Sequence, residues 1–511
     1  MSTAQIGITL SIVVYLAVML FIGFRFSRKN ATVGDFYLGG RKLGPFVTAM
    51  SAEASDMSSW LLMGLPGVAY LTGIADPGWT AIGLAIGTYV NWLIVAKRIR
   101  RYTHLANNSI TLPEFFKNRF RDTSGTLQLI GAIVIVVFFI PYTASGFAAC
   151  GKLFSSLFGV DYTVAMIVSA IVIVGYTATG GFLAASTTDF LQSIIMSVAL
   201  IIVLGYGVSV AGGMGAVMDN ARALPGYLSM FASHVVDTNS SSPYGFITIV
   251  STVAWGLGYF GMPHILLRFM AIEDENKLKL SRRVASVWVV IAMAVAILIG
   301  VIGLAMTAAG EVPALSGSDS ETIIVRIADL LSRNGFLFAI IAGLILAGIL
   351  ASTMSTADSQ LLAASSAVSQ DILYGVFHIN LFGKASMIAA RVTLVVIAVL
   401  AAFIARDPNS SVFGIVSFAW AGFGAAFGPV VLFALFWRRA NRFGALAGMV
   451  AGGVMVFAWK YLVRPLGGAW NIYELLPAFI VACVAIIVVS HVTAPPSKEI
   501  TDEFDQICAM K

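Results

Sequence analysis

Carboxylates and hydroxyls lie in the middle of apolar segments of this sequence, where a membrane or a protein core disfavours them. Residues 51–60 read SAEASDMSSW and carry Glu53 and Asp56, and residues 352–360 read STMSTADSQ. The second stretch has hydroxyls at helical i, i+3, i+4, i+7 spacing, which form one stripe: Ser352, Ser355, Thr356 and Ser359. Hydroxyls, together with carbonyls freed at a helix break, are hard oxygen ligands. We therefore expect a site for a small alkali cation.

Aromatic side chains lie near the same places and indicate a small solute. Residues 255–263 read WGLGYFGMP, in which the glycines and Pro263 interrupt the helix. The aromatic residues in question are Trp60, Tyr142, Trp255 and Tyr259. No Lys or Arg lies among them, so we expect backbone N–H groups and a half-helix dipole to hold a solute carboxylate. An aromatic wall suits a small apolar ring and can face a cationic amine, although each ring taken alone is typical of packing or of a membrane interface.

The segments that position these residues are predicted to be membrane spans. Of the 511 residues 59% are hydrophobic and 11% are charged, against about 25% charged residues in soluble proteins. Apolar runs of about 20 residues, the length that crosses a bilayer as a helix, recur throughout. We predict thirteen spans, at 5–24, 43–71, 78–96, 126–151, 160–180, 185–211, 244–267, 284–309, 336–370, 386–405, 410–437, 443–463 and 473–493. This pattern excludes a soluble enzyme.

The basic residues predict how the spans are oriented. Most of the 31 Lys and Arg residues fall on one side if the N-terminus is outside and the C-terminus is cytoplasmic. The exceptions are Lys152, Arg222, Arg326, Arg333, Arg406, Lys460 and Arg464. The sequence therefore predicts a multi-pass protein of the plasma membrane, the inner membrane of a bacterium. The net charge of +6 follows from this topology and indicates no nucleic-acid partner.

The two broken spans occupy corresponding positions in the chain. Spans 43–71 and 244–267 begin about 200 residues apart, and each would be the first helix of a five-helix unit. Because five is an odd number of crossings, the second unit would be inverted in the membrane relative to the first. We expect one transmembrane domain over 1–511, made of a peripheral helix at 5–24, inverted repeats at 43–211 and 244–437, two peripheral helices within 443–493 and a cytoplasmic tail at 494–511. Small-residue packing faces are the alternative explanation of the glycines, but they do not explain Glu53 and Asp56.

At these residues the sequence resembles the sodium/solute symporter family, and within it the bacterial sodium/proline symporters. The resemblance runs from about residue 8 to about residue 490. The matching strings are Tyr37-Leu-Gly-Gly-Arg41, Ser55-Asp-Met-Ser58, Trp60 to Gly67, Gly256 to Gly261, Pro263-His264-Ile265, Met354-Ser-Thr356 and Trp420 to Gly424 through Pro429. The resemblance implies an all-α, LeuT-like fold of about thirteen helices, with two inverted five-helix repeats whose first helices are broken, plus peripheral helices. It also implies inward sodium flow coupled to uptake of a small amino acid, with L-proline as the expected solute.

The resemblance further implies site residues. Sodium (Na⁺) would be bound by carbonyls of Ala54, Met57 and Ser352 and by hydroxyls of Ser355 and Thr356, with Asp56 important for coupling. Proline contacts would be Ser58, Trp60, Tyr142, Trp255, Tyr259 and Pro263. This sequence departs from the proline carriers at Glu53 and Ser59, where they have glycines, and at Met262, where they have glutamine.

Two further carboxylates suggest a second cation or proton site. Some members of the wider family use an aspartate at the position of Asp189, with hydroxyls matching Ser355 and Ser359, for a second sodium, and here Asp358 adds another carboxylate. In the alternative interpretation, Asp189 caps its helix at the cytoplasmic edge and Asp358 faces water. Sequence alone leaves both open.

Other function classes are less consistent with the pattern. Another small solute of the same family is the nearest alternative to proline. A cation channel would also use hydroxyls and carbonyls, but it predicts a repeated pore motif rather than two dissimilar broken helices. A membrane enzyme or sensor is disfavoured because only about eighteen residues follow the last span. Besides sodium, the solute and membrane lipid, we expect no obligate protein partner.

Overall fold

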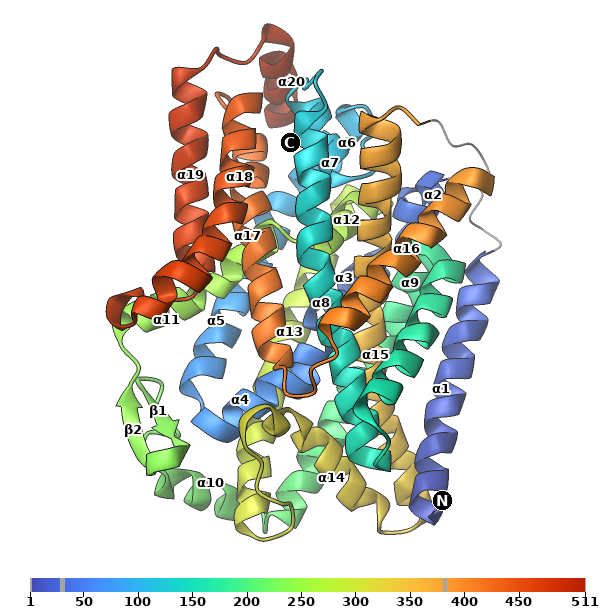
Figure 1. The fold of residues 1–511 in the computed structure, drawn as a ribbon, viewed down its shortest axis with the longest axis vertical. Helices are drawn as coiled ribbons and strands as arrows, with labels where there is room; N and C mark the ends of the chain where they lie inside the picture. Colours follow the sequence, from blue (N-terminus) through green and yellow to red (C-terminus); the bar gives the residue numbers. More distant parts are fainter. Residues whose placement is uncertain (1, 28–32, 380–383, 511) are drawn as a thin grey trace.

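The computed structural model describes residues 2–27, 33–379 and 384–510. Its long helices run along one common direction, and the N- and C-termini lie at opposite ends of the molecule (Figure 1). The unbroken long helices are α1 (Thr3–Ser27), α8 (Thr126–Phe158), α13 (Leu278–Ala308), α15 (Phe336–Ser366), α16 (Lys384–Ile404), α17 (Val412–Phe436), α18 (Arg442–Ala458) and α19 (Leu475–Val492). The chain is all-α apart from a small antiparallel hairpin of β1 (Ala232–Val235) and β2 (Ser240–Pro243), which the sequence analysis missed.

Ten helices of the described chain are long and apolar enough to cross a membrane, or eleven if one bent pair counts as a single span. The other two predicted spans are also helical: residues 45–72 and the first part of α9 (Tyr162–Val210). These two segments are too polar or too short to be identified as membrane spans from length and composition alone. The count of thirteen crossings therefore stays a prediction.

Both helices predicted to be broken are interrupted. The first consists of α3 (Pro45–Ser59), a π-helical turn η2 (Trp60–Gly64) and α4 (Leu65–Thr72), and Ser58 within it has φ 43° and ψ −169°. A positive φ is uncommon for a residue other than glycine, so the intrahelical hydrogen-bond ladder is interrupted there. The second consists of α11 (Phe246–Val253), the 3₁₀ turn η5 (Ala254–Phe260) and α12 (Pro263–Ala271), with a bend of 44°.

Glycine permits both the close packing and one further break. An added Cβ at Gly258 in η5 would lie 1.9 Å from Trp420 Nε1, so only glycine allows the indole of α17 to pack against this turn. In α9, Gly181 has φ 69° and ψ −175°, which divides the helix near the boundary predicted between the spans 160–180 and 185–211.

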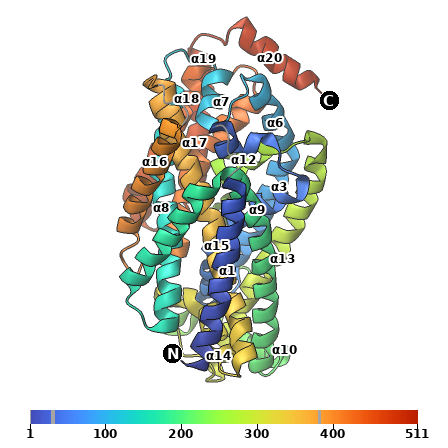
Figure 2. The ribbon, with the colours of Figure 1, turned by 90° about the vertical axis from the view of Figure 1, so that its right-hand side faces the viewer.

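Helix α15 lies at the centre of the bundle and carries the hydroxyl stripe. It packs against α1, α3, α8 and α9, and Figure 2 shows α1 running beside it. Every residue of α15 from Ile345 to Ser366 is buried. The stripe therefore faces other helices, among them the broken α3.

Shorter elements cover the two ends of the bundle. At the end that holds the C-terminus lie α2 (Val33–Leu38), α7 (Leu112–Arg119) and α20 (Lys498–Ala509), together with α6 (Ala96–Leu105), which continues α5 (Ala75–Val90). At the opposite end lie α10 (Met214–Ala223), α14 (Ile323–Ser332) and the hairpin. The predicted tail at 494–511 includes the helix α20, whose Phe504 is only 5% exposed.

Candidate ion and solute site

The structure brings the hydroxyl stripe of α15 against the break in α3. Ser355 Oγ donates a hydrogen bond to the Ala54 carbonyl at 2.8 Å and to the Ser352 carbonyl at 3.2 Å. Thr356 Oγ1 donates to the same Ser352 carbonyl at 3.1 Å. Four of the five predicted sodium ligands thus form one connected group. The fifth, the Met57 carbonyl, accepts from the Trp60 N–H at the break.

This group has the chemistry of a site for a hard cation. It offers carbonyl and hydroxyl oxygens only, and all of its residues are buried. Among the described residues, no cluster of three or more His, Cys, Asp or Glu side chains could hold a metal ion. Oxygen dipoles without thiolate or imidazole suit an alkali cation rather than a transition metal, so the residues present fit sodium.

Asp56 connects the ion ligands to the aromatic residues. Its Oδ2 accepts from the Tyr259 hydroxyl at 2.5 Å, and its backbone carbonyl accepts from the Tyr142 hydroxyl at 3.2 Å. The two tyrosines come from η5 and α8, so one residue of α3 contacts two other elements of the predicted solute site. A movement of α3 at Asp56 would therefore alter the hydrogen bonds of both tyrosines.

Glu53 faces away from the hydroxyl stripe. Its Oε1 accepts from Thr88 Oγ1 at 3.1 Å and from Trp92 Nε1 at 3.0 Å, both on the α5–η3 helix, where η3 is Asn91–Val95. Because both of these hydrogen bonds run to this helix, Glu53 contributes to the packing of α3 against its neighbour.

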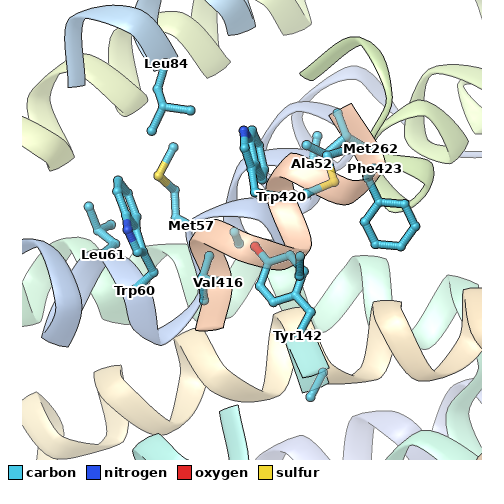
Figure 3. Close-up of a cluster of buried hydrophobic side chains, with 14 of the residues drawn as sticks. Ala52, Met57, Trp60, Leu61, Leu84, Tyr142, Met262, Val416, Trp420 and Phe423 are labelled. Atoms are coloured by element: carbon cyan, nitrogen blue, oxygen red, sulfur yellow. The ribbon is translucent and has the colours of Figure 1, made fainter. Parts of the chain in front are cut away.

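The predicted solute residues lie in one buried aromatic region. The ring centroids of Trp60 and Trp255 are 5.9 Å apart, and the Trp60 backbone N–H donates to Ser58 Oγ at 3.1 Å. Figure 3 shows Trp60 and Tyr142 in the buried cluster that also holds Met57 and Trp420. Pro263 is buried as the first residue of α12.

Three aromatic residues of this region were missed. Phe413 stacks against Trp60, with centroids 6.2 Å apart, and its ring is tilted against Trp255 at 5.5 Å. Tyr473 stacks on Trp255 at 5.0 Å. The indole of Trp420 donates to the Trp255 carbonyl at 2.7 Å. Trp420 lies in a string that carried the family resemblance, whereas Phe413 and Tyr473 have no signal in the sequence beyond being aromatic.

The second predicted cluster contains a cation of the protein itself. Arg268 of α12 contacts Asp189 Oδ2 at 3.1 Å and Ser359 Oγ at 2.5 Å through Nη2. Ser51 Oγ also donates to Asp189 Oδ2 at 2.7 Å, and Ser359 Oγ donates to Asp358 Oδ1 at 3.1 Å. The structure therefore brings both carboxylates and Ser359 together around one guanidinium.

The alternative interpretation of these two aspartates is wrong. Asp189 and Asp358 are both 0% exposed, and Asp189 lies inside α9 rather than at its cap. The predicted spans 244–267 and 126–151 end one residue before Arg268 and Lys152, but the structure places both residues inside helices. Arg268 is 1% exposed within α12, and Lys152 of α8 forms a buried ion pair with Glu321 at 2.9 Å. In both cases the helix extends past the predicted end of the span.

Comparison with known proteins agrees with this geometry. Residues 36–452 match the family described as the sodium:solute symporter family. The chain is 44% identical over 501 residues to the sodium/proline symporter of Haemophilus influenzae, covering 96% of each chain. It is 40% identical over 495 residues to the osmoregulated proline transporter OpuE of Bacillus subtilis, covering 97% of this chain and 96% of the other.

Solved structures share the fold. A sodium-coupled sialic acid symporter in a substrate-bound, outward-open state superposes with a TM-score of 0.78 at 18% identity, covering 96% of this chain and 99% of the other. MhsT in complex with L-phenylalanine gives a TM-score of 0.53 at 12% identity, covering 88% and 98%. Both confirm the LeuT-like architecture. The chain therefore belongs to the sodium:solute symporter family, and it is a sodium-coupled membrane transporter rather than an enzyme.

Proposed function

We propose that this protein imports L-proline together with sodium by alternating access. The hydrogen bond from Ser355 on α15 to the Ala54 carbonyl at the break of α3 carries the proposal, because it joins the two elements whose oxygens would bind the ion. The names of the relatives from Haemophilus influenzae and Bacillus subtilis support proline as the solute.

The sodium site would be formed by the carbonyls of α3 and the hydroxyls of α15. Sodium would be bound by Ala54, Met57, Ser352, Ser355 and Thr356. When sodium arrives, the Ser355 hydroxyl would turn its lone pair toward the ion and release the Ala54 carbonyl. Sodium would then replace this hydrogen bond as the link between α3 and α15, and so fix the position of the broken helix.

Proline would bind beside the same break. Ser58, Trp60, Tyr142, Trp255, Tyr259 and Pro263 would enclose its ring, with backbone N–H groups at the break holding its carboxylate. Asp56 would transmit the state of the sodium site to this pocket, since it contacts both Tyr142 and Tyr259. Ordering α3 for one ligand would then favour the other.

The proposed mechanism also needs a defined topology. Inverted repeats at 43–211 and 244–437 would each begin with a broken helix, and the extra helices would lie outside them. The N-terminus would be outside and the C-terminus cytoplasmic in a bacterial inner membrane, which agrees with termini at opposite ends of the bundle (Figure 1). Contact with lipid is supported by outward apolar side chains, such as Phe21 of α1, 68% exposed, and Phe403 of α16, 62% exposed.

The cluster of Asp189, Asp358 and Ser359 stays a prediction of a second cation or proton site. Arg268 supplies a positive charge within it, so a second sodium would have to displace or share this guanidinium. Under the two-site hypothesis, Asp189→Asn and Asp358→Asn each reduce transport and lower the Hill coefficient for sodium. An unchanged Hill coefficient in both variants would leave one coupled sodium.

The decisive experiment is uptake of labelled L-proline into proteoliposomes that contain the purified protein. We expect accumulation driven by an inward sodium gradient, competition by unlabelled proline and its close analogues, and no competition by bulky sugars. Accumulation without a sodium gradient, or inhibition by a sugar but not by proline, would contradict the proposal.

A further inference from the structure

A cavity lies on the outside of the helix bundle, between α9 and α13. It has a volume of about 540 Å³, within the range of ligand pockets, about 300–1,000 Å³. One face of α13 forms its wall, since residues at i, i+4 spacing line it in succession: Arg283, Val287, Ile291 and Val295. These positions extend over about 18 Å of helix. Val287 and Ile291 are 60% and 58% exposed, and α13 runs along one edge of the bundle in Figure 2, so the cavity opens outward.

The interior of the cavity is apolar, because its polar side chains are bonded within the protein. Trp288 Nε1 of α13 donates to Ser197 Oγ of α9 at 2.8 Å, and Ser197 Oγ donates to the Ser193 carbonyl at 2.7 Å. Aliphatic residues such as Leu200 and Ile201 of α9 form much of the remaining lining. Such a surface favours a hydrocarbon chain over a polar ligand.

Arg283 gives the cavity a positive charge at one end. It is exposed, and Lys279, one helical turn earlier on the same face of α13, is exposed as well. The acids of the preceding loop are bonded elsewhere: Glu273 to Lys277, Asp274 to the Asn276 N–H and Glu275 to Arg101. Within the described part of the chain, neither Arg283 nor Lys279 forms an ion pair. Both basic groups are therefore available to an anionic ligand.

The charged end of the cavity lies at the end of the bundle that holds the C-terminus. Helix α13 begins there, because Glu275 in the turn before it pairs with Arg101 of α6 at 2.6 Å. The proposed topology makes this end cytoplasmic, where anionic phospholipids give the membrane surface a negative potential. The basic end of the cavity is then level with the lipid headgroups, and its apolar face extends into the hydrocarbon core.

The inner wall of the cavity belongs to the broken helix. Met50 of α3 lines the cavity, one turn before Ala54, whose carbonyl accepts from Ser355. The start of α13 is also joined to α3, because Ser281 Oγ donates to the Pro45 carbonyl at 2.8 Å. A ligand that fills the cavity therefore packs against the part of α3 that precedes its break, and it stabilises the position that α3 has here.

We propose that this cavity binds an anionic phospholipid of the cytoplasmic leaflet. The phosphate of the headgroup pairs with Arg283 and Lys279 through charge-assisted hydrogen bonds. One acyl chain lies along α13 from Val287 to Val295 and contacts Met50 of α3. A phospholipid fits both parts of the cavity at once, because it joins an anionic group to a hydrocarbon chain. The proposal depends on the orientation of the bundle in the membrane, but not on which solute is transported.

The test is native mass spectrometry of the purified full-length protein in detergent, titrated with dioleoyl phosphatidylglycerol or with dioleoyl phosphatidylcholine. The wild type should bind one molecule of phosphatidylglycerol more tightly than further molecules, and more tightly than phosphatidylcholine. Arg283→Gln should weaken this binding about fivefold, and Arg283→Gln with Lys279→Gln about 25-fold, from the usual contribution of a basic residue at an anionic membrane surface. Arg282→Gln is the matched control, because the guanidinium of Arg282 lies over the ring of Tyr89 on α5, 5.3 Å from its centroid. It should leave the affinity unchanged.

A second pair of variants tests the apolar part without changing any charge. Val287→Trp should fill the middle of the cavity and remove the tight binding of phosphatidylglycerol. Val290→Trp is its control, because Val290 is 51% exposed on the same helix and is not part of the cavity lining. It should bind phosphatidylglycerol like the wild type. A wild-type unfolding temperature of each variant without added lipid shows that the substitution has not disrupted the fold.

The outcomes separate this proposal from the proposed function. Equal affinity of the wild type for both lipids, or equal binding by Arg283→Gln and Arg282→Gln, would mean that lipid surrounds the protein without a defined site, and it overturns the proposal. So does a wild-type dimer that binds no phosphatidylglycerol and dissociates in Val287→Trp, because the cavity would then be an interface between two copies. These measurements involve no transport, so the absence of sodium-driven proline uptake rejects the proposed function alone.

Discussion

Replacing Thr356 with valine tests the sodium site most directly. The change removes one hydroxyl from the proposed sodium site and keeps the branched shape of a side chain that is 4% exposed. Thr356 is a better target than Ser355, because Thr356 Oγ1 donates within its own helix, to the Ser352 carbonyl at 3.1 Å. Ser355 also joins α15 to α3, so its removal would disturb a contact between helices as well as the ion.

The expected effect is a large loss of sodium affinity. The lost contact joins an ion and a neutral oxygen in a buried place, so its size should be that of a hydrogen bond to a charged group, about 1.5–3 kcal/mol. That free energy corresponds to a decrease in sodium affinity of about 10- to 150-fold. Proline affinity at saturating sodium should change by less than about threefold, because Thr356 is not a proposed solute contact and differences below about 0.7 kcal/mol correspond to such factors.

The chain offers a matched control three residues away. Thr353 Oγ1 donates to the Ile349 carbonyl at 3.0 Å, the same kind of bond within the helix, and its methyl group faces Gly146 of α8 rather than α3. Thr353→Val should therefore leave the sodium dependence unchanged. The assay is the sodium concentration that gives half-maximal proline uptake into proteoliposomes. An unchanged value in Thr356→Val, or an equal shift in Thr353→Val, would refute the assignment of the site.

Three further predictions follow from other contacts. Asp189→Asn should lower the free energy of unfolding by about 3–5 kcal/mol, because it removes the carboxylate that is ion-paired with the buried Arg268. Thermal unfolding should show no comparable loss for Asp329→Asn, whose partner Arg333 is 68% exposed. Sodium and proline should raise each other's affinity by the same factor, since binding free energies are reciprocal, and a proline Kd that does not vary with sodium concentration would exclude coupling through α3. Phe504→Ala should detach α20, because Phe504 packs beneath the guanidinium groups of Arg98 and Arg119, each 5.5 Å from its ring centroid; hydrogen exchange should accelerate across Lys498–Ala509, whereas Phe443→Ala, at a side chain already 44% exposed, should leave α20 protected.

The sequence by itself determined the features that depend on local chemistry. Glycines and Pro263 in residues 255–263 predicted one broken helix, and the structure has a 3₁₀ turn and a bend there. The hydroxyl spacing in residues 352–360 predicted one stripe, since helix periodicity depends only on neighbouring residues in the chain. The ends of the spans were less certain, because hydropathy changes gradually along the chain. One additional helical turn decides whether Arg268 lies in an exposed loop or is buried within α12.

Only the tertiary structure decided which of these features meet. Ser355 and Ala54 are 301 positions apart, and Arg268 reaches Asp189 and Ser359 across 79 and 91 positions. No local pattern encodes such pairs, because they depend on how α3, α9, α12 and α15 pack. The same packing placed Met50, Leu200 and Arg283 around one cavity. Charge and hydroxyl content can be read along the chain, but a site needs groups from several elements at one place, and side-chain packing between helices determines that place.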